Sequence, residues 1–259
     1  MPALTLKGTE RDREASHPLD LAARRLHRVF NDGDWGSGGR FCGAWWQSVP
    51  KAYRRFILID DKPTVELDYS GLHAAMLFAE AGVVAPEDPY ARCFPGDSSS
   101  DLRNMVKRAF NALLNARSVD SLSEMSGYDP DRTGMHRKQF KKHVIECFPE
   151  IHSSFGTGVG VRLQRKDSDL SECVMLRFCE VGYPCLPVHD IFIVYYALEA
   201  DLRMIMRSEF QRLLGNGIGV TVKRSCISYD MSDGYIMEDI GSILQQTGPY
   251  QRFLSWHNQ

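Results

Sequence analysis

The sequence predicts an α+β fold in which an antiparallel sheet is backed by helices, and three observations lead to this class. Short runs of β-branched and aromatic residues at 64–68 and 182–197 alternate with longer amphipathic stretches. The chain of 259 residues is 43% hydrophobic and 25% charged, which is ordinary for a globular protein. No internal repeat interrupts the order. We therefore expect a flexible tail at residues 1–17 and one domain at residues 18–259.

The hydrophobic pattern predicts the elements in order. Residues 17–30 (HPLDLAARRLHRVF) have helical spacing and predict an amphipathic helix, which a glycine-rich loop follows. Strands are predicted at residues 41–49 and 53–59, and the turn DDKP leads from them into a strand at 64–68. Helices are predicted at residues 73–81, 98–116, 135–148, 167–181 and 199–214. A hairpin at 182–197 and a strand at 219–229 complete the sheet.

Composition excludes several classes of protein. The seven cysteines include no CxxC pair, which argues against a disulfide framework and against a structural zinc site. The N-terminus has no apolar signal segment, and the longest apolar run, IFIVYYAL, is too short to cross a bilayer. We therefore expect a cytoplasmic protein without membrane association.

The charge distribution permits a phosphate-binding groove. The formal net charge of −2 argues against a protein that coats nucleic acid non-specifically. Basic residues nevertheless gather in clusters, and each cluster alone is typical of a solvated helix face. The cluster members that we consider as candidates for binding nucleic acid are Arg54, Arg55, Arg137 and Lys138.

Two acids stand in apolar strand sequence. Asp68 ends the strand TVELD just before an apolar helical face, and Asp190 lies between Val188 and Ile191 in PVHDIFIV. An ionised carboxylate in such a place is costly unless hydrogen bonds, a cation or a metal compensate it. A helix cap or a structural ion pair would explain either acid alone. Two such acids at strand ends can also converge on a pair of divalent cations, as two-metal phosphoryl transfer requires.

A basic helix lies between the two acids. Arg103 and Lys107 are four residues apart in RNMVKRAFNALLNA, so they project from one helical face. Arg binds a phosphate through its bidentate fork and Lys binds it as a point charge, so the pair could hold a triphosphate. An exposed basic stripe is the alternative explanation.

The order of acid strand, Arg-xxx-Lys helix and His-Asp hairpin resembles motifs A, B and C of the family A DNA polymerases and of the related single-subunit phage-type RNA polymerases. The resemblance covers residues 36–205. It implies a polymerase palm at about residues 36–95 and 160–259 and a reduced helical fingers subdomain at 96–159. It also implies that Arg40 and Gln47 contact the primer-template near its growing end, with His189 close to the primer terminus.

Several positions depart from the family pattern. His73 stands where family A DNA polymerases carry a Glu that helps to exclude a ribose 2′-hydroxyl. Asn111 replaces a Phe, and Asn115-Ala116 replaces Tyr-Gly. Ile191 replaces the second acid of motif C. About 60 residues precede motif A, from which we expect neither an exonuclease domain nor a full thumb.

The resemblance implies a nucleotidyltransferase that extends a nucleic-acid 3′ end with two Mg²⁺ ions, for which Mn²⁺ can substitute. Asp68, Asp190 and the backbone carbonyl of Tyr69 would hold the metals, and Asp68 and Asp190 would be the catalytic residues. Residues expected to bind the dNTP or NTP are His73, Arg103, Lys107, Asn111 and Asn115.

A minimal DNA-directed DNA polymerase is the main interpretation, and a primer-template is its expected partner. A second protein could supply the missing thumb or clamp. A primase or RNA polymerase that uses NTPs shares the same site. A non-catalytic relative that only binds nucleic acid is the alternative of another class. Metal phosphohydrolases also carry a His-Asp pair, but they place it on a helix with further histidines upstream.

Overall fold

A computed structural model describes residues 19–54, 57–60, 62–97, 99–121, 125, 127–215 and 222–227. The predicted tail at residues 1–17 and the predicted Arg55 contact lie outside these residues. Within them the expected class is confirmed, because antiparallel sheets and helices make up a mixed fold. Among the described helices, none is both long and apolar enough to cross a membrane.

The larger sheet has four antiparallel strands in the order β4 (Leu186–Val188), β5 (Ile191–Tyr195), β3 (Thr64–Tyr69) and β6 (Val222–Ile227). A separate antiparallel pair consists of β1 (His27–Phe30) and β2 (Gly38–Cys42). Strand β3 is central, and it pairs with one strand from the hairpin and one from near the end of the chain. The sheet therefore joins segments far apart in sequence.

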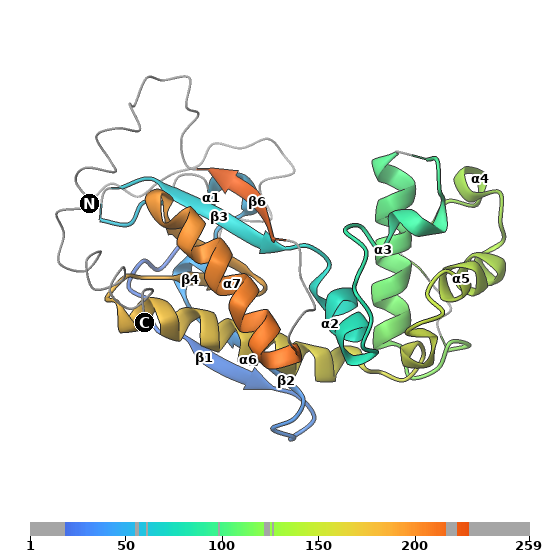
Figure 1. The fold of residues 1–259 in the computed structure, drawn as a ribbon, viewed down its shortest axis with the longest axis horizontal. Helices are drawn as coiled ribbons and strands as arrows, with labels where there is room; N and C mark the ends of the chain where they lie inside the picture. Colours follow the sequence, from blue (N-terminus) through green and yellow to red (C-terminus); the bar gives the residue numbers. More distant parts are fainter. Residues whose placement is uncertain are drawn as a thin grey trace.

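Helices divide between the sheet and a second group (Figure 1). The helices α6 (Gly160–Glu180) and α7 (Glu199–Leu214) lie against the strands, and α2 (Leu72–Glu80) leads away from them. The second group contains α3 (Ser100–Asn115), α4 (Pro130–Thr133) and α5 (Arg137–Glu146). Short elements are α1 (Lys51–Arg54) and the 3-10 turns η2 (Trp45–Ser48), η3 (Ala91–Cys93), η4 (His152–Ser154) and η5 (Tyr196–Leu198).

The two faces of the larger sheet are covered differently. Alternate residues of β3 and β5, including Leu67, Tyr69 and Phe192, join the main hydrophobic core with the helices. On the opposite face, Ile193 packs in a smaller cluster with Trp46 of η2. Because side chains alternate along a strand, Asp68 points to the face opposite Leu67 and Tyr69. The sheet thus separates the acid from the main core.

The first predicted elements are wrong. Residues 17–30 do not form the expected helix in their described part, because His27–Phe30 pairs with Gly38–Cys42 as a β-hairpin. Leu19 and Leu21 remain 40% and 56% exposed, so the apolar face of such a helix has no core to pack on. In the predicted strand at 41–49, residues 41–42 end β2 and residues 45–48 form η2, and the predicted strand at 53–59 starts inside α1.

The later helices follow the predicted periodicity. In α3, residues at spacings of four and three, such as Val106, Phe110 and Leu113, are fully buried. The helix α6 begins seven residues before the predicted start at residue 167 and contains 21 residues.

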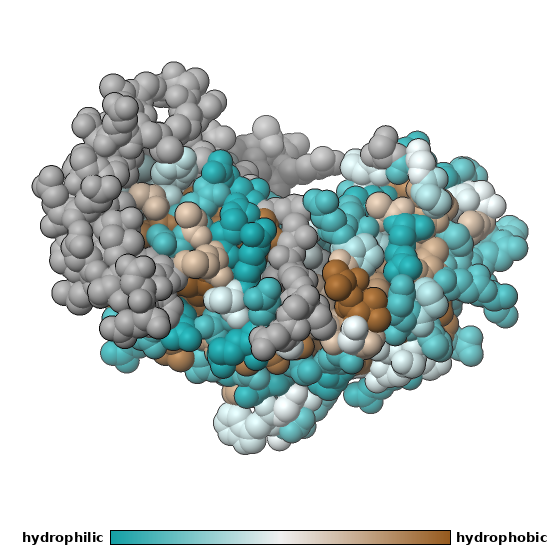
Figure 2. Space-filling view, in the orientation of Figure 1, coloured by the Kyte–Doolittle hydropathy of each residue, from teal (hydrophilic) through white to brown (hydrophobic). Residues whose placement is uncertain are grey.

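Figure 2 shows mostly hydrophilic side chains on one face of the molecule, with a small hydrophobic group where α2 lies.

Candidate active site

Asp68 lies near the end of the central strand. The hydroxyl of the next residue, Tyr69, donates a hydrogen bond of 2.6 Å to the carbonyl of Met206 in α7. This bond fixes the end of β3 on the helix, and Asp68 consequently faces the other side. The chain then turns sharply into α2 through Gly71, whose φ of 63° lies in the left-handed region that glycine adopts without strain.

Asp190 lies in the turn of the neighbouring hairpin. Asp68 pairs with Ile191 across the strands, and the backbone N–H of Tyr69 donates to the carbonyl of Asp190 at 3.4 Å. His189 has a φ of 60°, a left-handed conformation that turns the chain between β4 and β5. The register therefore brings the two predicted acids, Asp68 and Asp190, to the same edge of the sheet, which we call the acidic edge.

The charge of Asp190 acts on the carboxylate of Asp68. Burial, and next the nearby charge of Asp190, raise the pKa of Asp68 to about 7. Lys107 and Lys51 act in the opposite direction without cancelling the rise. Gly71 and not Asp68 caps α2, and Asp68 forms no ion pair within the described part of the chain. It is one of two neighbouring carboxylates that a cation would stabilise.

Two histidines border this pair of acids. Burial, and next the Arg40 guanidinium, lower the pKa of His73 to about 4 against an opposing effect of Asp190. Loss of hydration and the same guanidinium lower the pKa of His189. Both imidazoles are consequently neutral at pH 7, so they can offer hydrogen bonds but not positive charge.

The helix α3 presents its polar face toward this edge. Lys107 is exposed, and its charge acts on Asp68. Arg103 is held by the carboxylate of Asp88, and its guanidinium lies 5.6 Å from the centre of the Tyr90 ring. Of the predicted phosphate-binding pair, Lys107 is thus open to a ligand, whereas Arg103 already has a partner that a ligand would have to share.

The two asparagines of α3 interact with each other. The side-chain amide of Asn115 donates to the carbonyl of Asn111 at 2.7 Å. A Cβ atom at Gly160 would lie 2.1 Å from Asn115 Oδ1, so the start of α6 passes close to this side chain. Asn115 therefore lies where α3 crosses α6, and a nucleotide contact from it stays a prediction.

Two residues predicted to contact nucleic acid are occupied by the fold itself. The amide nitrogen of Gln47 donates to the carbonyls of Phe41 and Pro187 at 2.9 and 3.2 Å. The Arg54 side chain is 14% exposed, and its guanidinium lies 3.6 Å from a carboxylate oxygen of Glu66. Both side chains tie the segment around η2 to the sheet, which leaves them little capacity for a ligand.

The predicted basic contacts of α5 are exposed but lie elsewhere. Arg137 and Lys138 form its first turn, and Figure 1 shows α5 on the side of α3 that is turned away from the sheet. The Arg137 guanidinium lies 6.0 Å from the centre of the Tyr128 ring. The structure therefore does not bring these two residues to the acids, and a role for them would require nucleic acid that extends across the second helix group.

Sequence analysis missed a third acid at this edge. Asp167 in α6 is 2% exposed, and its carboxylate lies 3.5 Å from a guanidinium nitrogen of Arg40. Burial, and next Asp190, raise the pKa of Asp167 to about 7, and Arg40 opposes the rise. Its spacing from Leu163 and Ser171 puts it on the buried stripe of the helix, which is the sequence signal that could have identified it.

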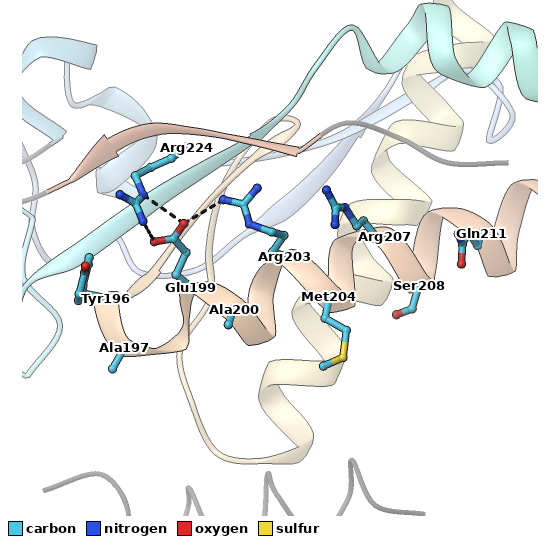
Figure 3. A pocket seen from close by; sticks show the side chains of 10 residues that line it. All are labelled: Tyr196, Ala197, Glu199, Ala200, Arg203, Met204, Arg207, Ser208, Gln211 and Arg224. Carbon is cyan, nitrogen blue, oxygen red and sulfur yellow. Dashed lines mark hydrogen bonds and ion pairs between the residues drawn. The ribbon is translucent and has the colours of Figure 1, made fainter. Parts of the chain in front are cut away.

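A separate cavity of about 790 Å³ lies along α7 (Figure 3). Glu199 at its end accepts hydrogen bonds from Arg203 and Arg224. Arg224 pairs with Leu67 across the strands, so this cavity lies on the helix-covered face of the sheet. Asp68 points to the opposite face, and the cavity is therefore not part of the acidic edge.

Comparisons with known proteins give a likeness of fold. Neither a protein-family model nor a curated protein matches the sequence. Among solved structures, the chain is similar to the "POL domain of Pol1 from M. smegmatis complex with DNA primer-template and dNTP", with a TM-score of 0.52 and 12% identity. The match covers 77% of this chain and 46% of that chain, so this chain spans less than half of the neighbour's length. The mixed α/β fold is thus similar to that of a DNA polymerase domain.

Proposed function

We propose that this protein is a nucleotidyltransferase that adds nucleotides to a nucleic-acid 3′ end, as a minimal DNA polymerase. The proximity of Asp68 and Asp190 at one sheet edge, with Lys107 opposite them, is the observation that carries the proposal. The polymerase-like fold supports it, since this arrangement occurs in a chain of which 77% is similar to part of such a domain. On this proposal the sheet is the palm and the α3–α5 group is a reduced fingers subdomain.

The donor set fits Mg²⁺. Carboxylate oxygens are ligands that Mg²⁺ prefers, and it is commonly bound by one or two carboxylates together with substrate phosphates. Among the described residues, no three His, Cys, Asp or Glu side chains come together that could hold a metal by themselves. Asp68 and Asp190, with the carbonyl of Tyr69, would therefore hold two ions jointly with the nucleotide. Bound Mg²⁺ would activate the 3′-hydroxyl and neutralise charge on the leaving diphosphate.

Other residues near the two acids would bind and orient the nucleotide. The exposed ammonium of Lys107 would bind the triphosphate, and Arg103 would add a second contact from the same helix face. The neutral imidazole of His73 at the start of α2 would lie near the incoming sugar. Phosphoryl transfer leaves little covalent chemistry to the protein, so rate enhancement would come from positioning and electrostatics.

The use of NTPs, as in a primase or RNA polymerase, is the second candidate. His73 favours it, because this half-buried neutral side chain replaces the acid that the resemblance associates with exclusion of the 2′-hydroxyl. A partner protein that closes over the nucleic acid stays a prediction in either case.

Single-nucleotide extension of a labelled primer-template tests the proposal. We expect incorporation with Mg²⁺ by the wild-type protein and its near-complete loss in Asp68→Asn and Asp190→Asn, with nucleic-acid binding retained. Glu146→Gln is the matched control, because this exposed acid of α5 pairs only weakly with Lys142, at 3.6 Å. Parallel reactions with dNTPs or NTPs, with and without primer, separate the polymerase from a primase. Binding without incorporation under all conditions would favour a non-catalytic relative.

A further inference from the structure

Asp167 is a buried carboxylate with incomplete compensation. It lies in the third turn of α6, 2% exposed, and neither of its oxygens accepts a hydrogen bond from any residue that the structure describes. A buried ionised carboxylate normally requires several hydrogen bonds or a close cation. Among the described residues Arg40 is the cation that pairs with it, but the distance of 3.5 Å is longer than a charge-assisted hydrogen bond. This acid is costly to the fold and therefore calls for an explanation.

Arg40 is also incompletely satisfied. Its buried Nε has no hydrogen-bond acceptor among the described residues, while the side chain as a whole is 33% exposed. The charge of Arg40 acts on both His73 and His189, which border Asp190. The guanidinium therefore lies between α6 and the acidic edge, with donors still available to a ligand.

A second arginine of the β1–β2 hairpin, Arg28, also pairs with acids of α6, and its contacts show the geometry of a purely structural ion pair. The guanidinium of Arg28 donates to Asp169 at 2.9 Å, to Glu172 at 3.0 Å and to the carbonyl of Gly39 at 2.8 Å. This pair also connects α6 to the β1–β2 hairpin, and its geometry is complete. The Arg40–Asp167 pair differs in being longer, incomplete and turned toward the acidic edge.

The next turn of α6 holds the other side of the same edge. The hydroxyl of Ser171 donates to the carbonyl of His189 at 3.2 Å. Since Asp167 and Ser171 are four residues apart, they lie on one face of the helix. One helical face thus contacts both Arg40 and the turn that carries Asp190, and so sets the distance between them.

We propose that Asp167 is a positioning residue that holds the Arg40 guanidinium toward the terminal nucleotide of the primer beside Asp190. This inference rests on the proposed function and adds a residue to that site. Asp167 acts through Arg40 and not as a metal ligand, because a guanidinium lies beside it and no three-ligand group exists among the described residues.

A double-mutant cycle tests the inference by single-turnover extension at pH 8. We expect Asp167→Asn to slow incorporation about tenfold, the scale of coupling between contacting residues, with little change in the KM for nucleotide. The loss should disappear in an Arg40→Gln background. Asp169→Asn is the control, because it removes an acid of the same helix that pairs with Arg28 and Arg165. Equal losses in both backgrounds, or the same loss in Asp169→Asn, would overturn the inference.

A second measurement does not depend on activity. In the protein without nucleic acid, the NMR signal of the Arg40 Nε–H, assigned by its absence in Arg40→Gln, should shift in Asp167→Asn and not in Asp169→Asn. An unchanged signal would overturn the pairing. A wild-type protein that neither binds nor extends a primer would overturn the proposed function and, with it, the role at the terminus. An active wild type with a fully active Asp167→Asn variant would overturn this inference alone.

Discussion

Replacing Asp167 by Asn should stabilise the free protein above pH 7, although we expect the same change to impair extension. Burial, and next the charge of Asp190, raise the pKa of this carboxyl from 3.8 to about 7 against the opposing effect of Arg40. A folded-state pKa above the unfolded value means that stability is greatest at low pH and falls as the pH rises through 7. The full penalty of ionisation corresponds to on the order of 4 kcal/mol at pH 8.

The neutral amide avoids this penalty. A buried polar group without a partner costs about 1–3 kcal/mol, but the protonated carboxyl of the wild type bears the same kind of cost, so this cost largely cancels in the comparison. The gain at pH 8 should therefore approach the ionisation penalty of about 4 kcal/mol, or roughly 8–16 °C in Tm for a chain of this size. At pH 4 the wild-type carboxyl of the folded protein is protonated and neutral like the amide, so the two proteins should differ little. The difference in Tm should thus grow from near zero at pH 4 to its full value at pH 8.

Thermal unfolding of both proteins in EDTA, at several pH values from 4 to 8, measures this difference. Asp68 also has a raised pKa, but it is present in both proteins and its contribution cancels. Asp169→Asn serves as control, because this carboxylate has two arginine partners and its removal should not stabilise the fold at any pH. A difference between Asp167→Asn and wild type that stays constant with pH would refute the reasoning, since it would mean that the carboxyl titrates normally in the folded state.

Three further predictions concern single contacts. Lys107→Ala should raise the KM for nucleotide about tenfold to a hundredfold, the value of one charge-assisted contact, while Arg108→Ala, which removes the next basic residue around α3, should not; equal effects in steady-state kinetics would mean that the helix is only a solvated basic face. Tyr69→Phe should lower the free energy of unfolding by about 1–2 kcal/mol, since it removes the buried hydrogen bond to Met206, and denaturant titration would show no change if that bond does not form. Discrimination against NTPs should be weaker than about 10⁴-fold, because His73 replaces the usual acid; competition between dNTP and NTP in the extension assay measures it, and a larger preference for dNTP would contradict the prediction.

The acids Asp68 and Asp190 show what the sequence predicts well. Each interrupts a short apolar strand, and an ionised group is conspicuous there because burial makes it costly. Their position at one edge of the sheet was predictable from the strand ends, and the register of β3 with β5 confirms it. Their catalytic role stays a prediction. Gln47 and Arg54 show what the sequence does not predict. Only the structure reveals that Gln47 donates hydrogen bonds to backbone carbonyls and that Arg54 pairs with Glu66.

The N-terminal segment shows why periodicity alone can mislead. Apolar residues at helical spacing predict a helix at residues 17–30, but a short helix is stable only when a core covers its apolar face. The structure offers no such cover to Leu19 and Leu21, whereas Gly38–Cys42 offers a complete strand partner to His27–Phe30. Tertiary pairing therefore decided the local structure, and the pattern of one segment could not reveal the partner.

Asp167 was missed for a related reason. When the helix is predicted to begin at residue 167, an acid at its first position is explained as favourable to the helix N-terminus. The observed start at Gly160 moves the same acid two turns inward, onto the stripe formed by Leu163, Leu170 and Val174. There the macrodipole gives little benefit and burial is costly, and the paired cation, Arg40, lies outside the helix. The predicted boundary, seven residues too late, therefore made Asp167 look like an ordinary residue of a helix N-terminus. The observed boundary places it in the buried stripe, next to Arg40.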